Sequence, residues 1–380
     1  MNQEIYLDYH ATTPVIPEVL EAMSPYFCNH FGNANSNHHW GWKAEMAINK
    51  SGKQVADLVG CKASQVYFTS GATESIHWAI IGWAKKNPSG QIITTATEHK
   101  ATYGACEWAE SLGLNVITLP VDSYGKINKE DLEKALQKNI PTLLSVIHGN
   151  NEIGTLNPIE ELSQLVHSYD NGFIHVDAAQ SVGKIPVNFS QLDLDFLSFS
   201  GHKLYAPKGI GALVIKDKDS IAPLFIGGGQ QRGMRAGTSN IPSIVGLGAA
   251  CKWCHDHLDE EQQRLKSMRD FMIEKLISTG QFKLNGHPTE RLPYNINLTC
   301  KSLTLDKLML KLPKVGFSSS SACSSDSLAA SHVLLAIGLS KEEADRSFRF
   351  GIGHSTTQEE LDQVIEKIME LLKESEDFLS

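Results

Sequence analysis

Short apolar runs alternate with amphipathic stretches along the first two thirds of the chain. The apolar runs end in small or polar residues, as buried strands do, and the stretches between them carry apolar positions at helical spacing. Regular alternation of strand and helix predicts a largely parallel sheet with helices on both faces. The expected strands are 5–8, 66–70, 91–95, 116–119, 142–148, 173–177, 196–199 and 211–215, and the expected helices are 17–26, one ending at Gly60, 72–86, 100–112, 129–137 and 158–168.

The pattern changes after the last of these strands. A long helix begins there, followed by shorter strands and helices between charged loops. Capping boxes formed by Ser340 with Glu343 and by Thr356 with Glu359 predict two helix starts, and the second helix carries an apolar stripe suited to packing. We therefore expect an α/β protein with a large domain of residues 14–257 and a small α+β domain made of residues 1–13 and 258–380.

Charge and cysteine content narrow the class of protein. The chain has 380 residues, a formal net charge of −9 and seven cysteines. An acidic balance provides no electrostatic footprint for nucleic acid or for an anionic membrane, and no apolar run is long enough to span a bilayer. An odd number of scattered cysteines argues against a disulfide framework and favours a reducing compartment. We expect a soluble cytoplasmic protein.

Residues that follow the predicted strands are the first candidates for chemistry, because open α/β sheets bind ligands at the carboxyl ends of their strands. Lys203 follows the strand at 196–199. A buried lysine can have a lowered pKa and form Schiff bases, although most lysines after strands are surface residues. Asp177 ends an apolar strand, where a carboxylate is costly unless paired, and a protonated pyridine nitrogen would be a suitable partner.

Other strand ends supply groups for an anion and for a flat ring. Ala72 and Thr73 open a helix whose first amides and hydroxyl could receive a phosphate, or could form an ordinary helix start. His99 could stack on a heteroaromatic ring or be an ordinary polar residue, and Asn151 and Gln180 could bond a ring oxygen. Taken together with the lysine and the aspartate, these groups predict one cofactor, pyridoxal phosphate.

Three further segments carry candidate groups. The glycine-rich run 227–238 contains two arginines and could contact a phosphate, with a mobile loop as the alternative. Arg349 lies between aromatic residues and could bind a carboxylate bidentately or form a structural salt bridge. Cys323 lies in a run of serines, where a thiol should be accessible, and this context favours a nucleophile over a buried structural cysteine.

One motif points elsewhere. Cys251, Cys254 and His255 match the pattern of c-type haem attachment. They fall inside a predicted helix of a chain for which we expect no export signal, so we expect neither haem nor zinc there. His38 and His39 lack cysteine or carboxylate companions at metal-binding spacing. We predict no metal site.

The chain resembles the pyridoxal-phosphate-dependent cysteine desulfurases of the class V aminotransferase group, in the branch of iron–sulfur-cluster assembly and nitrogen fixation. The resemblance rests on the runs SGATES, TEHKA, NNEIG, HVDAAQSVGK and SFSGHK, and it extends from Tyr6 to the final helix. It implies the aspartate-aminotransferase-like fold of pyridoxal-phosphate-dependent transferases and the conversion of L-cysteine to L-alanine. Sulfur would be held as a persulfide on Cys323 and passed to an acceptor protein for iron–sulfur cluster assembly or tRNA thiolation.

The resemblance also implies a homodimer and a role for each site residue. Lys203 would bind the cofactor covalently, Cys323 would attack the substrate sulfur, and His99 would stack on the ring. Asp177 would pair with the pyridine nitrogen. The other implied contacts are Asn151 and Gln180 with the ring substituents, Ala72, Thr73, Ser200 and His202 with the phosphate, Thr238 of a second subunit with the same phosphate, and Arg349 aided by Asn33 with the substrate carboxylate.

Two alternatives stay open. One is another class V activity, such as a selenocysteine lyase, although most such enzymes need no mobile thiol. The other is a sulfur-carrier or scaffold-binding protein with little turnover, which would not need Lys203 and Asp177. The family pattern also has a glycine where this chain has Ser320 and a proline where it has Ala34.

Overall fold

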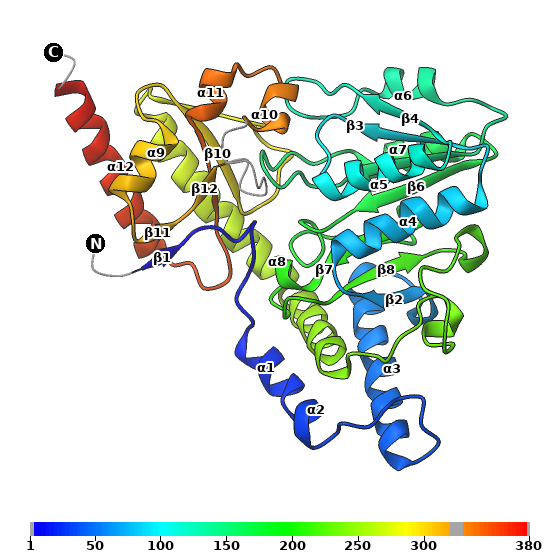
Figure 1. Cartoon of the computed structure of the whole chain (residues 1–380). Coiled ribbons are helices and arrows are strands. Elements are labelled where there is room, and N and C mark those ends of the chain that lie inside the picture. The colour runs from blue at the N-terminus through cyan, green and yellow to red at the C-terminus, as the bar shows by residue number, and fades with distance from the viewer. Residues whose placement is uncertain (1–3, 320–329, 378–380) are drawn as a thin grey trace.

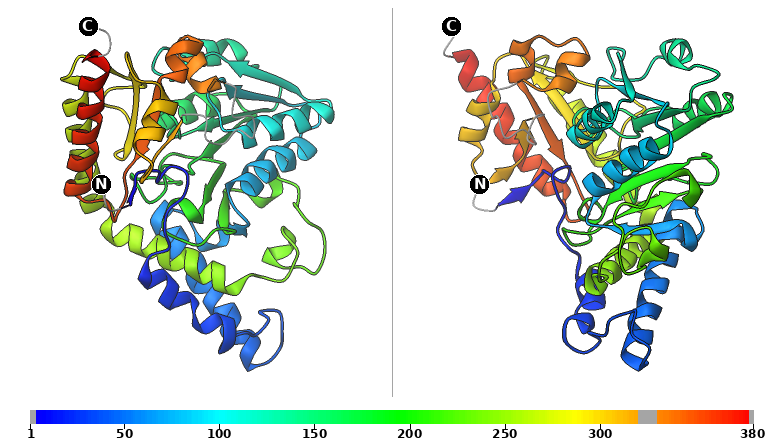
Figure 2. Two further views of the ribbon diagram at one scale, coloured as in Figure 1. Left: turned by 60° about the vertical axis from the view of Figure 1, so that its left-hand side comes forward. Right: turned by 45° about the vertical axis from the view of Figure 1, so that its right-hand side comes forward.

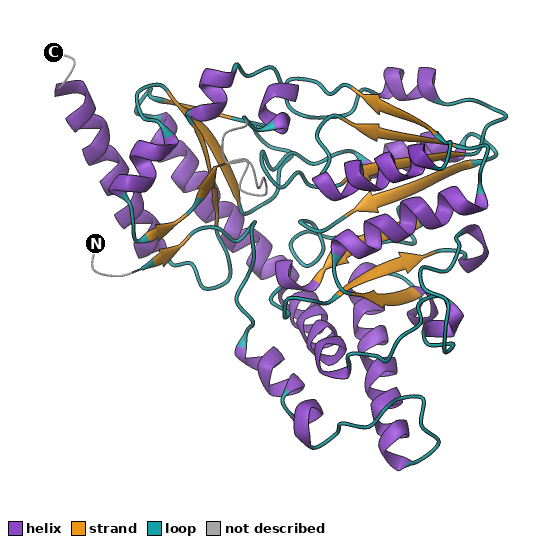
Figure 3. Cartoon of the chain, in the orientation of Figure 1, coloured by secondary structure: helices purple, strands orange, loops and turns teal. Residues whose placement is uncertain are grey.

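A seven-stranded sheet forms the centre of the larger part of the molecule (Figures 1 and 3). The computed structural model describes residues 4–319 and 330–377. Five neighbouring strands pair in parallel, and one strand next to them runs antiparallel to both of its neighbours. The predicted largely parallel sheet is confirmed. In spatial order, the strands are β2 (Val66–Thr69), β8 (Gly211–Ile215), β7 (Phe196–Ser200), β6 (Gly172–Asp177), β5 (Thr142–Ile147), β3 (Gln91–Thr95) and β4 (Asn115–Leu119).

Helices cover both faces of this sheet. Successive strand residues point to opposite faces, and the strands carry buried apolar side chains on both. Tyr67 packs in one apolar cluster with Trp78, whereas its neighbour Phe68 belongs to the cluster on the opposite face. The first face is covered by α4 (Ala72–Lys86) and α5 (Lys100–Ser111), and the second by helices that include α3 (His39–Val59), α7 (Ile159–His167) and α8 (Ile241–Ile277).

The 37-residue helix α8 connects the two parts of the molecule. Figure 2 shows it running from beside α3 to the second, antiparallel sheet. The predicted boundary after residue 257 lies inside this helix, so the two parts share one continuous element. The second sheet has the order β12 (Ser318–Ser319), β13 (Ser347–Gly351), β10 (Asn295–Cys300) and β9 (Phe282–Leu284), and α12 (Gln358–Asp377) packs on α8.

The N-terminal segment begins in a separate two-stranded sheet, then bridges to β13 of the second sheet and crosses to the first. Its short strand β1 (Ile5–Tyr6) pairs in parallel with β11 (Val315–Gly316). The predicted helix at 17–26 is wrong in one respect, because the chain forms α1 (Pro17–Met23) and then a separate α2 (Pro25–Cys28). Pro25 lacks an N–H and cannot continue α1.

Local capping chemistry explains two of the later helix starts. Ser340 and Glu343 form the predicted capping box at α11 (Lys341–Asp345). The second predicted box is wrong by one residue: Thr357 and Glu360 exchange the two bonds, at 3.2 and 3.0 Å. The hydroxyl of Thr356 instead accepts the backbone N–H of Gly353 at 3.0 Å. None of the described helices is long and apolar enough to cross a membrane.

The remaining elements are short and lie between those above. They are α6 (Lys129–Ala135), α9 (Leu305–Lys311), α10 (His332–Ala336), η1 (Ala63–Gln65), η2 (Gly201–Lys203), η3 (Lys218–Ser220) and η4 (Gln231–Gly233).

Candidate active site

A cavity of about 480 Å³ lies at the carboxyl ends of the large sheet's strands, where the N-terminal segment and β13 meet them. Its walls bring together most of the residues expected from the sequence. The predicted residues that line it are Ala72, Thr73, His99, Asn151, Asp177, Gln180, Ser200, His202, Lys203 and Arg349.

The N-terminus of α4 opens into one end of this cavity. Gly71 occupies the N-cap position without a side-chain cap, so the first backbone N–H groups of the helix face the cavity. Ser200 approaches from β7, with its Oγ 3.5 Å from the place that a Cβ on Gly71 would occupy. His202 lies two residues further along and also lines the cavity. A helix N-terminus with uncapped N–H groups and adjacent hydroxyls is suited to bind an anion.

Lys203 and Asp177 follow neighbouring strands in the middle of the cavity. Lys203 Nζ donates hydrogen bonds to the carbonyl oxygens of His10 and Ala11, the second at 2.8 Å. Asp177 ends β6 and accepts the backbone N–H of Ala179 at 3.0 Å. Burial raises the pKa of Asp177 above its ordinary value, although His99 and Lys203 act to lower it. A carboxylate in this setting is best stabilised by a cationic partner.

His99 precedes α5 and is held by its first turn. The ring Nδ1 accepts the backbone N–H of Ala101 at 3.1 Å, which fixes how the imidazole faces the cavity. Beside it, Glu98 is fully buried and bridges two strand ends by accepting bonds from Thr95 (2.6 Å) and from the N–H of Ile147 (3.1 Å). Burial raises the pKa of Glu98 to about 8, so this acid is largely protonated at neutral pH.

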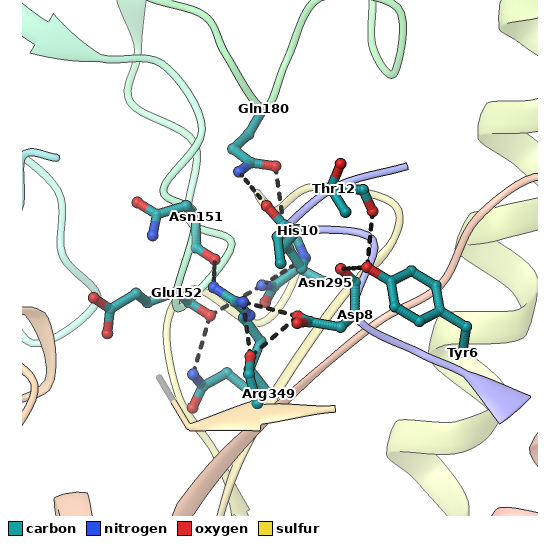
Figure 4. A network of polar contacts seen from close by, with 12 residues as sticks. Tyr6, Asp8, His10, Thr12, Asn151, Glu152, Gln180, Asn295 and Arg349 are labelled. Atoms are coloured by element: carbon teal, nitrogen blue, oxygen red, sulfur yellow. Dashed lines mark hydrogen bonds and ion pairs between the residues drawn. The ribbon is translucent and has the colours of Figure 1, made fainter. Parts of the chain in front are cut away.

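Arg349 reaches the cavity from β13 of the second sheet (Figure 4). Its guanidinium donates to the backbone oxygen of Asn151 (2.8 Å), to Ser318 Oγ (2.7 Å) and to Asp8 Oδ1 (3.0 Å). The side chain is only 3% exposed, and its Nε is buried without a hydrogen-bond partner among the described residues. A donor left over on a buried guanidinium is available to a carboxylate ligand.

The N-terminal segment supplies site residues that sequence reasoning missed. Asp8 pairs with Arg349, and Thr12 Oγ1 contacts His202 Nδ1 at 3.1 Å. Burial lowers the pKa of His202 to about 4, and Lys203 adds to this effect, so its imidazole is neutral. His10 lines the cavity directly. Motif and strand-end arguments could not find these residues, because their partners lie far along the chain.

Two predicted site residues do not line this cavity. Asn33 and Thr238 are both exposed, on loops that meet at a separate cavity of about 530 Å³, whose lining includes Ala34 and Ser239. A third, Cys323, lies outside the described residues. The structure therefore brings together the expected cofactor end of the site within one chain, while the contributions of these three residues stay predictions.

The loop that carries Thr238 is anchored to the large sheet. Gln231 pairs with both backbone groups of Phe68 on the edge strand β2, at 2.6 and 2.7 Å. Arg235 forms an ion pair of 2.7 Å with Glu74, which lies in the first turn of α4. The loop is thus tied to the first turn of α4 at one end of the cavity, although Thr238 itself is exposed and does not line the cavity.

The haem-like motif lies elsewhere, on α8. Cys251 and Cys254 are buried in the core, whereas His255 is exposed, so the three side chains do not converge. Within residues 4–319 and 330–377, no group of three or more histidine, cysteine or acidic residues could hold a metal ion.

Comparison with known proteins connects this geometry to a family. The chain matches the aminotransferase class-V family over residues 5–364. It belongs to the class-V aminotransferases. Cysteine desulfurase IscS of Dictyoglomus turgidum is 44% identical to this class-V chain, over 98% of the chain and 96% of the relative. Within the family, the chain is therefore a member of the cysteine desulfurase group.

Solved structures support the same placement of this class-V chain. A NifS-like protein superposes with a TM-score of 0.90 at 33% identity, covering 98% of this chain and all of the other. SspA, solved in complex with cysteine, superposes with a TM-score of 0.82 at 37% identity, covering 92% and 98% of the two chains. The expected transferase fold is confirmed.

Proposed function

We propose that this protein uses pyridoxal phosphate to convert L-cysteine to L-alanine and that it holds the released sulfur as a persulfide on Cys323. One observation carries the proposal: a helix N-terminus, a buried carboxylate and a lysine converge on one cavity. When bound, pyridoxal phosphate supplies an electron sink for charge that develops on the substrate.

The residues present fit this cofactor at both of its ends. The uncapped N–H groups at Ala72 and Thr73, with Ser200 and His202 beside them, would hold the phosphate. At the other end, burial raises the pKa of Asp177. A protonated ring nitrogen next to this carboxyl would lower its pKa and stabilise its ionised form. The three further contacts expected with the ring come from His99 as a stacking partner and from Asn151 and Gln180 as amide donors.

The substrate would bind between the cofactor and the second sheet. Arg349 would bind its carboxylate, since a guanidinium donor is left over and the side chain already faces the cavity. Asp8 and Ser318 would hold the guanidinium in place from behind.

The remaining chemistry is assigned to two side chains. Lys203 Nζ, which lies in the cavity, would take up and return a proton of the bound substrate. The thiolate of Cys323 would attack the sulfur of the bound substrate; the carbon–sulfur bond breaks, and its electron pair stays on the three-carbon fragment, which leaves as alanine after protonation. The persulfide would then pass to an acceptor protein for iron–sulfur cluster assembly or tRNA thiolation.

We further propose a homodimer in which the Thr238 loop completes the phosphate site of the second copy. The exposed position of this loop supports the proposal, as does a set of exposed aromatic and apolar side chains near the Asn33 loop: Phe27, Phe31, Trp40, Trp42 and Met46. The six described cysteines are free thiols, in keeping with an expected cytoplasmic location.

The test is the release of alanine from L-cysteine by the purified protein with pyridoxal phosphate and a thiol reductant. Wild type should release alanine over many turnovers. Lys203→Ala should lose the visible absorption of the bound cofactor, whereas Cys323→Ser should keep it and lose desulfuration. Alanine from Cys323→Ser at the wild-type rate would remove this thiol from the mechanism, and turnover of L-selenocysteine alone would favour a selenocysteine lyase.

A further inference from the structure

Two contacts favour one orientation of the Gln180 side-chain amide in this site. Its Nε2 lies 3.1 Å from the backbone oxygen of His10, and a carbonyl oxygen can only accept. Its Oε1 lies 2.5 Å from the hydroxyl of Tyr294, which also lies 2.9 Å from the backbone oxygen of Gln180. Burial raises the pKa of this hydroxyl, so it keeps its one proton and donates toward these two acceptors. Rotating the amide by half a turn would place two oxygens against each other at His10.

A chain of hydrogen bonds with one fixed direction leads to this amide, and Figure 4 shows its part from Asn295 through His10 to Gln180. It begins at Arg291, a buried guanidinium that can only donate, which donates to Asn295 Oδ1 at 2.8 Å. Asn295 Nδ2 therefore donates, at 3.0 Å, both to the carbonyl oxygen of Glu152 and to His10 Nε2. Because Nε2 accepts, the proton of the neutral imidazole is on Nδ1, and it is donated to Gln180 Oε1 at 3.2 Å.

The ring of His10 is held in the plane that this chain requires. It stacks on Tyr294 with centroids 4.3 Å apart and an angle of 20° between the planes. The residue is 1% exposed, and burial together with Arg349 and Lys203 lowers its pKa well below the ordinary value. His10 is therefore a neutral imidazole with both nitrogens engaged, which rules it out as a general base.

We propose that Arg291, Asn295 and His10 form a positioning relay that fixes Gln180 with an N–H group toward the cavity, so that the site selects a ring oxygen in its anionic, accepting form. This inference rests on the proposed use of pyridoxal phosphate. The relay would determine whether the 3-oxygen of that cofactor is bound ionised or protonated. One amide N–H bonds the His10 carbonyl, and the second is left for the ligand. A free Gln180 could present its carbonyl oxygen instead, which would favour a protonated ring oxygen.

The experiment follows the visible absorption of the bound cofactor as a function of pH. His10→Phe keeps an aromatic ring on Tyr294 but removes the donor to Gln180, whereas His10→Asn can place an amide N–H where Nδ1 was. We expect His10→Phe to raise the pH midpoint of the absorption change by roughly half a unit, because the His10 carbonyl and Tyr294 still favour the same amide orientation, and His10→Asn to restore most of the shift. If His10→Phe does not fold, Tyr294→Phe removes the other donor to the same oxygen and should shift the midpoint in the same direction.

Measuring cofactor binding without turnover distinguishes a failure of the relay from a failure of the proposed function. Wild type should bind pyridoxal phosphate more tightly than its 3-deoxy analogue, and His10→Phe should lose about threefold of that preference. An unshifted midpoint and an unchanged preference in a folded, cofactor-binding His10→Phe would overturn the relay but leave the proposed function intact. A wild type that binds neither compound would overturn the proposed function itself.

Discussion

Replacing Asp177 by asparagine should stabilise the cofactor-free protein while weakening cofactor binding. Asp177 is 2% exposed, and burial raises its pKa above the ordinary value of 3.8 despite the opposing effects of His99 and Lys203. Its ionised form is therefore less stable in the folded protein than in the unfolded chain. Asparagine keeps the shape of the side chain and removes the charge.

The size of the effect follows from the surroundings of the carboxylate. A poorly compensated buried polar group costs about 1–3 kcal/mol, and the two nearby cations offset part of this. We expect Asp177→Asn to raise the unfolding free energy of the cofactor-free protein by about 1–2 kcal/mol at neutral pH, or the Tm by roughly 1–3 °C. Since the folded-state pKa is raised, wild type should lose stability relative to the variant as pH rises above 3.8.

With pyridoxal phosphate bound, wild type should instead be more stable than Asp177→Asn. Removing one partner of a buried ion pair costs about 3–5 kcal/mol, so Asp177→Asn should bind pyridoxal phosphate at least about 100-fold more weakly and gain little stability from it. Thermal unfolding with and without cofactor measures both effects. Asp256→Asn, which breaks an exposed pair with Lys252, is the control and should change the unfolding free energy by less than about 0.5 kcal/mol. A cofactor-free Asp177→Asn less stable than wild type would refute the reasoning.

Three other substitutions test separate features. The pKa of Glu98 is raised to about 8, so the unfolding free energy of wild type should fall relative to that of Glu98→Gln between about pH 4.5 and pH 8 and stay constant above pH 8. Urea unfolding of both proteins across this range measures the difference, and parallel pH profiles would contradict the prediction. Gly71→Ala should weaken cofactor binding about tenfold or more in a titration, since φ is 156° there and the methyl group would enter the phosphate cradle, whereas Gly113→Ala, also at positive φ but in open space, should leave it unchanged. Trp42→Asp should convert the expected dimer to monomers in sedimentation velocity, and Trp108→Asp, equally exposed on α5, should not.

Residues next to a strand end could be predicted from the sequence, because one local pattern locates both the strand and the residue. Lys203, Asp177 and Thr73 each follow an apolar run, and the parallel sheet brings their strand ends to the same edge. The error at the last capping box is of another kind. Thr356 and Thr357 are equivalent in a sequence pattern. Only the local hydrogen bond from the N–H of Gly353, three residues before Thr356, shows which hydroxyl is free to cap.

Contacts made by the N-terminal segment could not be predicted in this way. Asp8 and Arg349 are separated by 341 residues, and His10 and Asn295 by 285. No periodicity connects such positions, and each side chain taken alone is ordinary. The relay toward Gln180 is likewise a property of three-dimensional proximity, although its direction follows from donor and acceptor chemistry once the contacts are known.

The position of the N-terminal segment has a consequence for the order of folding. β1 pairs with β11, Asp8 pairs with Arg349, and the carbonyl oxygens of His10 and Ala11 hold Lys203. During synthesis the N-terminal end emerges first, yet its partners β11 and Arg349 emerge near the end. The large sheet can therefore form while the ribosome is still translating, but the cavity is completed only after nearly the whole chain has been made. Competence to bind cofactor should arise late, as the closing step of folding.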